Sequence, residues 1–136
     1  MVVLNLFLIR LTETPNYNNM EDKKIQQNNI YIVLVHGYQG NPSNMDTAKK
    51  FFQDNNYTNV HAFDYSKTTS HHIARNASLL FEWLKENNPT NNKIVLIGFS
   101  MGGLVIRKLA LDYHPTLDIF KLVTLATPNY GAHKPE

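Results

Sequence analysis

The chain has 136 residues, of which 43% are hydrophobic and 18% charged, and it contains no cysteine. This length and composition fit one compact globular domain. They exclude a disordered chain, a disulfide framework and a thiolate metal site. The net charge of +2 is too small to indicate a nucleic acid as partner, and no basic run is interleaved with aromatic residues. No apolar run reaches the roughly 18 residues that a membrane span requires.

Residues 1–11, MVVLNLFLIRL, form an apolar segment that could be mistaken for a signal peptide. A signal peptide has a basic segment before its apolar core and a small-residue cleavage site after it, and neither is present here. We interpret the segment as an edge strand or a non-native start. The cellular location of the protein is therefore undetermined, with the cytoplasm favoured over secretion. Residues 12–29 are polar and lack periodicity, which predicts a linker ahead of a domain at residues 30–136.

Buried β-strand patterns and helical periodicities alternate along the rest of the chain. Ser43 or Asn44 is expected to cap the first helix and Ser70 the second, because short polar side chains accept hydrogen bonds from free backbone N–H groups. The alternation predicts a three-layer α/β fold, with a mostly parallel sheet and helices on both faces. The predicted strands are residues 30–35, 59–65, 93–97 and 120–126, and the helices follow Ser43 or Asn44, Ser70 and Ser100.

The sequence Gly98-Phe99-Ser100-Met101-Gly102-Gly103 lies between a buried strand and an amphipathic helix. A G-x-S-x-G pattern in this context places a serine on a sharp, strained turn with its hydroxyl exposed. Gly98 and Gly102 are expected where strand and helix approach too closely for a side chain. The alternative is a helix cap in a nucleotide-binding turn, but neither G-x-G-x-x-G nor a Lys before Ser or Thr is present. Ser100 is therefore predicted to be a nucleophile.

A serine nucleophile also needs backbone donors for the oxyanion that develops on the substrate. The Met101 amide lies at a helix N-terminus, where free N–H groups and the helix dipole favour negative charge. A second donor is expected from the loop that begins at His36-Gly37, directly after the first buried strand. The best candidate in that loop is the N–H of Tyr38. We interpret His36 as a structural histidine that hydrogen-bonds the loop rather than as a catalytic base.

Three motifs in this order resemble those of α/β-hydrolase fold lipases and esterases, in particular class 2 lipase-like and inositol-deacylase-like enzymes. The motifs are VHGYQGN at 35–41, IGFSMGGL at 97–104 and LATPNYG at 125–131. The resemblance implies the N-terminal part of an α/β-hydrolase fold over roughly residues 30–131. It implies a nucleophile at Ser100, oxyanion amides at Tyr38 and Met101, motif residues at His36, Gly37, Gly98, Gly102 and Gly103, and an acyl pocket lined by Thr127, Pro128 and Tyr130.

The same resemblance implies hydrolysis of carboxylic esters, often of fatty acids, without a metal or an organic cofactor. The implied partner is a small ester or lipid substrate, with transient contact with a lipid surface, and the oligomeric state stays open. The strand-end residues Asp64 and Tyr65 match a position that is usually structural in this family. Thioester cleavage or acyl transfer on the same fold, and a catalytically dead remnant that binds a partner, remain alternatives.

A triad would also require an acid and a histidine, which follow the serine in this fold. Asp112 and His114 lie at the far end of the helix that begins at Ser100, on the order of 18 Å away at 1.5 Å per residue. Asp118 precedes its strand and so lies at the wrong edge of the sheet. His133 is at the correct edge and is kept as a candidate base. The family takes both groups from two further strands, so we expect a C-terminally truncated chain with little or no turnover.

Overall fold

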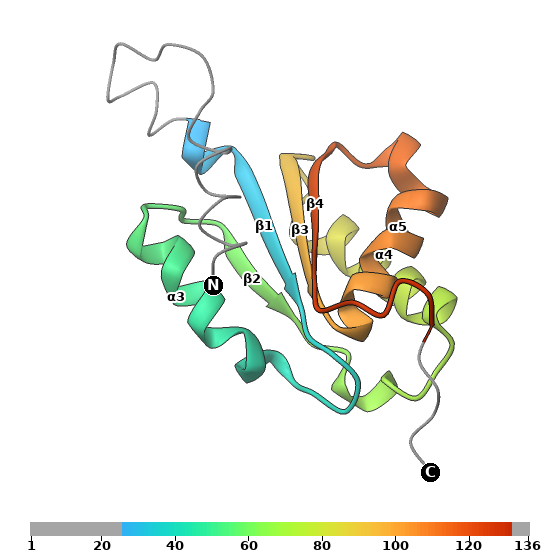
Figure 1. Cartoon of the computed structure of the whole chain (residues 1–136). Helices are drawn as coiled ribbons and strands as arrows, with labels where there is room; N and C mark the ends of the chain where they lie inside the picture. Colours follow the sequence, from blue (N-terminus) through green and yellow to red (C-terminus); the bar gives the residue numbers. More distant parts are fainter. Residues whose placement is uncertain (1–25, 132–136) are drawn as a thin grey trace.

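A parallel sheet between two layers of helices forms the centre of a computed structural model of the chain, which describes residues 26–131 (Figure 1). Its strands lie in the order β2-β1-β3-β4, and every neighbouring pair is parallel. The α/β class predicted from the sequence is therefore confirmed. The strands are β1 (Ile30–Val35), β2 (Val60–Phe63), β3 (Lys93–Phe99) and β4 (Ile119–Leu125).

Helix α3 (Asp46–Asp54) covers one face of the sheet, while α4 (Ile73–Asn87) and α5 (Met101–Tyr113) cover the other (Figure 1). The chain winds outward from β1 to β2, then crosses over to β3 on the other side of β1 and continues to β4. The direction of winding therefore reverses between β1 and β3. In open α/β sheets, ligands bind outside the carboxyl ends of the strands at such a switch point.

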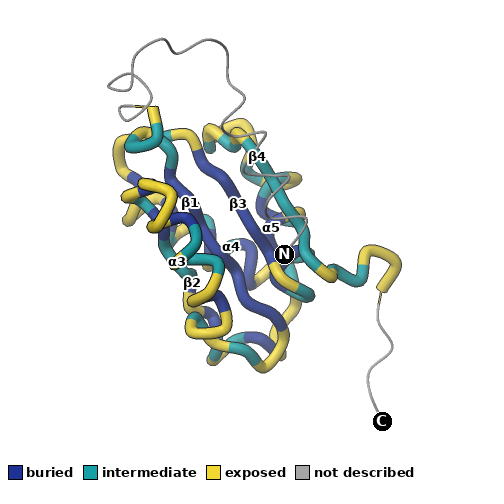
Figure 2. Tube along the Cα trace, turned by 60° about the vertical axis from the view of Figure 1, so that its left-hand side comes forward, coloured by how far each residue is buried: buried dark blue, intermediate teal, exposed yellow. Residues whose placement is uncertain are grey.

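The two central strands are the most deeply buried elements (Figure 2). Uninterrupted apolar residues suit these strands because helices cover both of their faces. Side chains alternate between the faces, so the core has two parts. Val33 and Val35 pack with Leu80 and Leu109 on the side of α4 and α5, whereas Ile32, Leu34 and Ile97 pack with Phe52 on the side of α3.

The helix starts predicted from Ser43, Asn44 and Ser70 are wrong. A 3₁₀ turn, Pro42–Met45, precedes α3, and its cap is Asn41, whose side chain accepts a hydrogen bond from the Ser43 N–H. Asn44 is instead the reciprocal partner in this capping box. Helix α4 begins after His72 without a side-chain cap, and Ser70 lies in the turn before it.

Two smaller differences concern the ends of the described region. Residues 26–28, which the sequence predicts to be linker, form a helical turn before β1. Strand β3 continues to Phe99, so it reaches Ser100 directly. The apolar segment at residues 1–11 and the candidate base His133 lie outside the described residues.

Candidate functional site

The carboxyl ends of β1 and β3 meet at the switch point, at the lower edge of the sheet in Figure 1. The loop after β1 begins with His36 and Gly37, and the turn after β3 is centred on Ser100. A Cβ added to Gly37 would lie 3.1 Å from the Cβ of Ser100. Two motifs that are distant in the sequence are thus in contact, as the parallel pairing of β1 with β3 requires.

Ser100 has an unusual backbone conformation, with φ 52° and ψ −122°. Residues other than glycine rarely adopt such angles, and holding one there costs about 1–3 kcal/mol. Three hydrogen bonds fix the residue: its N–H donates to the Leu125 carbonyl at 2.8 Å, and its carbonyl accepts from the Gly103 N–H at 3.0 Å and the Thr127 hydroxyl at 2.9 Å. The Ser100 hydroxyl caps no N–H of α5 and has no recorded partner within residues 26–131.

Glycines occupy the positions around Ser100 where β3, α5 and β1 approach one another most closely. A Cβ on Gly98 would lie 2.5 Å from the Gly102 carbonyl, and one on Gly102 would lie 2.2 Å from the Val35 oxygen. A Cβ on Gly103 would lie 1.9 Å from Oγ1 of Thr127. Real Cβ contacts are not this short, so no side chain fits at these three positions.

The two amides predicted as oxyanion donors lie on the two facing turns. The Met101 N–H is the first of α5, where the dipole leaves partial positive charge. The Tyr38 N–H belongs to the loop after β1. Neither N–H donates to a backbone acceptor in the part of the chain that the structure describes.

His36 is fully buried, and its ring is engaged with the loop rather than with Ser100. Its Nδ1 lies 3.0 Å from the Gly37 carbonyl, so Nδ1 carries the proton and donates it. The ring stacks on Tyr65 at a centroid distance of 4.4 Å, and the Tyr65 hydroxyl donates to the His36 carbonyl. Burial raises the pKa of Tyr65, so this hydroxyl stays protonated and keeps donating. The geometry agrees with a structural histidine that orders the loop.

The sequence predicts only a strand-end position for Tyr65 and does not indicate its contact with His36. It comes from the end of β2, and no local pattern relates it to the loop after β1. The neighbouring Asp64 is exposed and accepts a hydrogen bond from the Ser66 N–H at 2.9 Å. Hydrogen bonds from Ser66 lower the pKa of this carboxyl group.

A family model described as "Domain of unknown function (DUF7379)" matches residues 8–134. The chain belongs to this family. A thermostable monoacylglycerol lipase from Bacillus sp. (strain H-257) is 29% identical over 97 residues, which cover 65% of this chain and 37% of the lipase. The chain thus matches well under two thirds of that enzyme's length. This distant similarity points to a hydrolase.

The loop after β4 of this DUF7379 chain lies beside the Ser100 turn. Thr127, predicted to line a pocket, directs its hydroxyl to the Ser100 carbonyl, and Pro128 is half-buried. Tyr130 is fully exposed. Arg107 of α5 donates to the Asn129 side chain at 2.7 Å and so fixes the loop on the helix. The pocket role of these residues remains a prediction.

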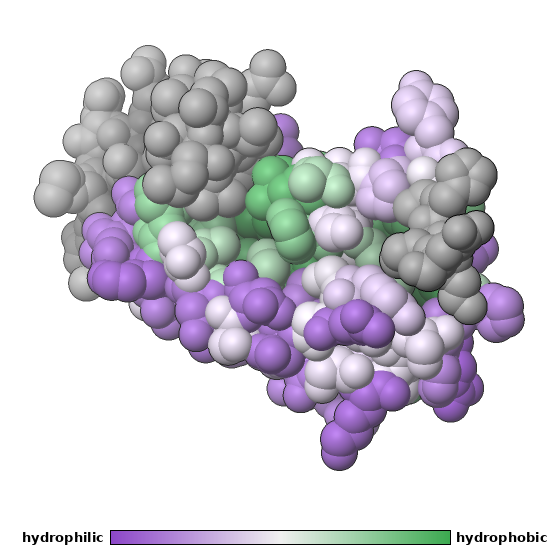
Figure 3. All heavy atoms as spheres, turned by 60° about the horizontal axis from the view of Figure 1, so that its bottom comes forward, coloured by the Kyte–Doolittle hydropathy of each residue, from purple (hydrophilic) through white to green (hydrophobic). Residues whose placement is uncertain are grey.

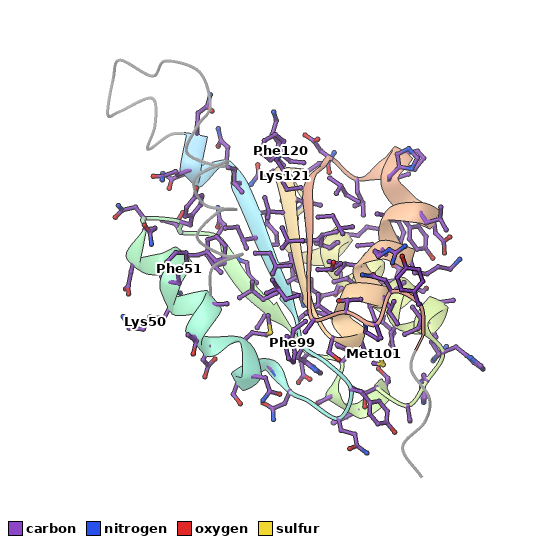
Figure 4. The ribbon with its side chains drawn as sticks, viewed as in Figure 1. Lys50, Phe51, Phe99, Met101, Phe120 and Lys121 are labelled. Atoms are coloured by element: carbon purple, nitrogen blue, oxygen red, sulfur yellow. The ribbon has the colours of Figure 1, made fainter. Side chains whose placement is uncertain are left out.

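The surface around Ser100 combines apolar and polar groups. Phe99, which precedes the serine, is 44% exposed, and Tyr38, which follows Gly37 in the facing loop, is 50% exposed. Figure 4 shows Phe99 and Met101 at this lower edge of the sheet, Met101 at the start of α5. Figure 3, which is turned so that the lower edge of Figure 1 comes forward, shows a band of apolar residues across the middle with polar residues below it.

Neither a metal-binding cluster nor a helix that could cross a membrane is found within residues 26–131. Within residues 26–131, no cluster of three or more His, Asp or Glu side chains is arranged to hold a metal ion. No helix in that region has both the length and the apolar character needed to cross a membrane.

Proposed function

We propose that this chain carries the serine nucleophile and the oxyanion hole of a carboxylic ester hydrolase. The observation that carries the proposal is the strained backbone of Ser100 at the switch point of the sheet, with a hydroxyl that makes no hydrogen bond within residues 26–131. Strain of this kind is kept where surrounding structure enforces it, and functional turns are where it concentrates. The similarity to a monoacylglycerol lipase supports an ester with an acyl chain as the substrate class.

In the proposed reaction, Oγ of Ser100 attacks the acyl carbonyl carbon while its proton passes to a base. The carbonyl oxygen becomes an oxyanion that accepts hydrogen bonds from the Met101 and Tyr38 amides. The bond to the alcohol then breaks, the alcohol leaves with a proton, and water hydrolyses the acyl-serine. One preorganised donor to an oxyanion contributes about 100- to 1,000-fold in rate.

The base in this proposal is a histidine that follows Ser100 in the chain. His36 does not suit the role, because it is fully buried and its unprotonated nitrogen, Nε2, contacts no hydrogen-bond donor within residues 26–131. None of the histidines in the described region is recorded in a hydrogen bond with Ser100. His133 remains the candidate base.

A fluorophosphonate probe tests the proposal, because it phosphonylates activated serines. We expect an adduct on the peptide that contains Ser100, identified by mass spectrometry, and its loss in Ser100→Ala. Ser70→Ala is the matched control, since it removes an exposed turn hydroxyl elsewhere and should leave the adduct unchanged. Equal labelling of wild type and Ser100→Ala, or no adduct at Ser100 after prolonged exposure, would contradict the proposal.

A further inference from the structure

We propose that Thr127 is a positioning residue that orients and polarises the oxyanion amide of Met101, an inference that rests on the proposed function. The Thr127 hydroxyl donates to the Ser100 carbonyl at 2.9 Å. That carbonyl and the Met101 N–H belong to the same planar peptide group. A hydrogen bond that fixes the carbonyl end therefore fixes the direction of the N–H at the other end.

The end of β4 supplies most of what holds Ser100 in its strained conformation. Of the three hydrogen bonds to the Ser100 backbone, one comes from the Leu125 carbonyl and one from the Thr127 side chain. The third, from the Gly103 N–H, is internal to the turn. Without Thr127, the Ser100–Met101 peptide would keep only this internal bond on its carbonyl.

Two further features adapt the molecule to this contact. Ala126 has a φ of 49°, a left-handed conformation that alanine rarely adopts. It separates Leu125 from Thr127 and lets the carbonyl of one and the side chain of the other both reach Ser100. Gly103 leaves the space that the threonine side chain fills, since a Cβ there would lie 1.9 Å from Oγ1. A helix would ordinarily favour alanine over glycine at this position.

The other proposed oxyanion amide has a matching arrangement. The Tyr38 N–H shares its peptide group with the Gly37 carbonyl, which accepts from His36 Nδ1 at 3.0 Å and from the Gly40 N–H at 3.1 Å. Each of the two peptides thus has one side-chain donor and one backbone donor on its carbonyl. Hydrogen bonds in series polarise one another, so a donor at the carbonyl strengthens the N–H as a donor. The recurrence on both peptides favours a role in the oxyanion hole over a fold contact alone.

The test compares Thr127→Val, which keeps the shape but loses the hydroxyl, with Thr127→Ser, which keeps the hydroxyl. Thr116→Val is the matched control, because its hydroxyl also donates to a backbone carbonyl, that of Tyr113 at the far end of α5. The first readout is the amide proton shift of Met101 by NMR. We expect it to move upfield in Thr127→Val and to stay near the wild-type value in the other two variants.

The second readout is the rate of fluorophosphonate reaction at Ser100, with thermal unfolding measured on each variant. We expect Thr127→Val to react about tenfold more slowly, a fraction of the effect of losing a whole oxyanion donor. Thr127→Ser should restore the rate and Thr116→Val should not change it. An unchanged Met101 shift and rate in Thr127→Val, or equal losses in Thr127→Val and Thr127→Ser, would overturn the inference. A wild-type chain that does not react at Ser100 would refute the proposed function, while the NMR comparison would still decide the Thr127 contact.

Discussion

The turns after β1 and β3 face each other across the switch point, yet different forces hold them. The turn after β3 is fixed by close packing as well as by the hydrogen bonds to Ser100: Gly98 and Gly102 lie against backbone atoms, and Gly103 lies against the Thr127 side chain. The loop after β1 is fixed by hydrogen bonds from buried side chains, those of His36 and Tyr65. In Figure 2 the chain is buried along β1 and becomes exposed shortly beyond it.

This difference has a consequence for the two halves of the proposed site. Close packing restricts the Ser100 turn, since a movement of α5 toward β1 or β3 brings backbone atoms into collision. Hydrogen bonds hold the Tyr38 loop less tightly than packing holds the Ser100 turn, because each hydrogen bond can be lost separately at a modest cost in free energy. We therefore expect the Tyr38 loop to accommodate a substitution more readily than the Ser100 turn does.

The largest loss of stability is expected from Gly102→Ala. Alanine is favoured over glycine in helices by about 1 kcal/mol, so propensity alone predicts a more stable protein. The new Cβ would instead lie 2.2 Å from the Val35 oxygen and 2.5 Å from the His36 oxygen, both of which are backbone atoms that cannot turn away. Overpacking of this kind costs about 3 kcal/mol or more. Urea unfolding should therefore show a large loss of stability.

Gly37→Ala is the control on the opposite turn. Its Cβ would meet the Cβ of Ser100 at 3.1 Å and the Phe99 carbonyl at 3.4 Å, contacts that a small shift of the loop relieves. We expect a loss of about 1 kcal/mol or less. If Gly102→Ala were as stable as Gly37→Ala, close packing could not be what distinguishes the turn after β3.

Local sequence patterns were sufficient to predict the α/β class, the central strands and the crossovers. Continuous β-branched residues mark β1 and β3 because those strands are buried on both faces. The starts of α3 and α4 could not be predicted in the same way, whereas α5 begins directly after Ser100 as predicted. Several short polar residues lie before each helix, and the backbone angles at Asn41 and His72, rather than residue type, decide which of them is the cap.

The support of the candidate site could not be predicted either, because it depends on contacts between distant residues. The Tyr65 hydroxyl and the His36 carbonyl are separated by 29 positions, and the Thr127 hydroxyl and the Ser100 carbonyl by 27. Sequence motifs indicate which residues follow which strand. They do not indicate which side-chain hydroxyl reaches which carbonyl, since that depends on the strand order and the packing of both turns.

A smaller loss of stability is expected from Tyr65→Phe, which removes a hydrogen bond from the loop after β1. The ring and its stacking on His36 remain, but the buried His36 carbonyl loses a donor. Such a loss costs about 1–2 kcal/mol. Because burial raises the pKa of Tyr65, the hydroxyl is protonated throughout the range in which the protein is handled. The loss should therefore be the same at pH 6 and pH 8 in denaturant unfolding.

Tyr31→Phe is the matched control for that measurement. Tyr31, a residue of β1, also has a buried ring, and its hydroxyl makes no hydrogen bond within residues 26–131. Its removal should change stability by less than about 0.5 kcal/mol. Equal losses in the two variants would show that the contact with His36 does not support the loop.

The smallest effect is expected from Asp64→Asn, beside Tyr65 at the end of β2. Hydrogen bonds from Ser66 lower the pKa of Asp64 below its unfolded value of about 3.9. A lowered pKa means that the carboxylate stabilises the fold above pH 4 and loses this contribution as the pH falls through the folded value. Asparagine keeps a neutral acceptor at this position, so the difference in stability between wild type and Asp64→Asn should shrink between pH 6 and pH 3. We expect less than about 0.5 kcal/mol at pH 6, because the side chain is exposed. A loss as large as that of Tyr65→Phe would mean that an exposed carboxylate, not a buried hydroxyl, supports the turn after β1.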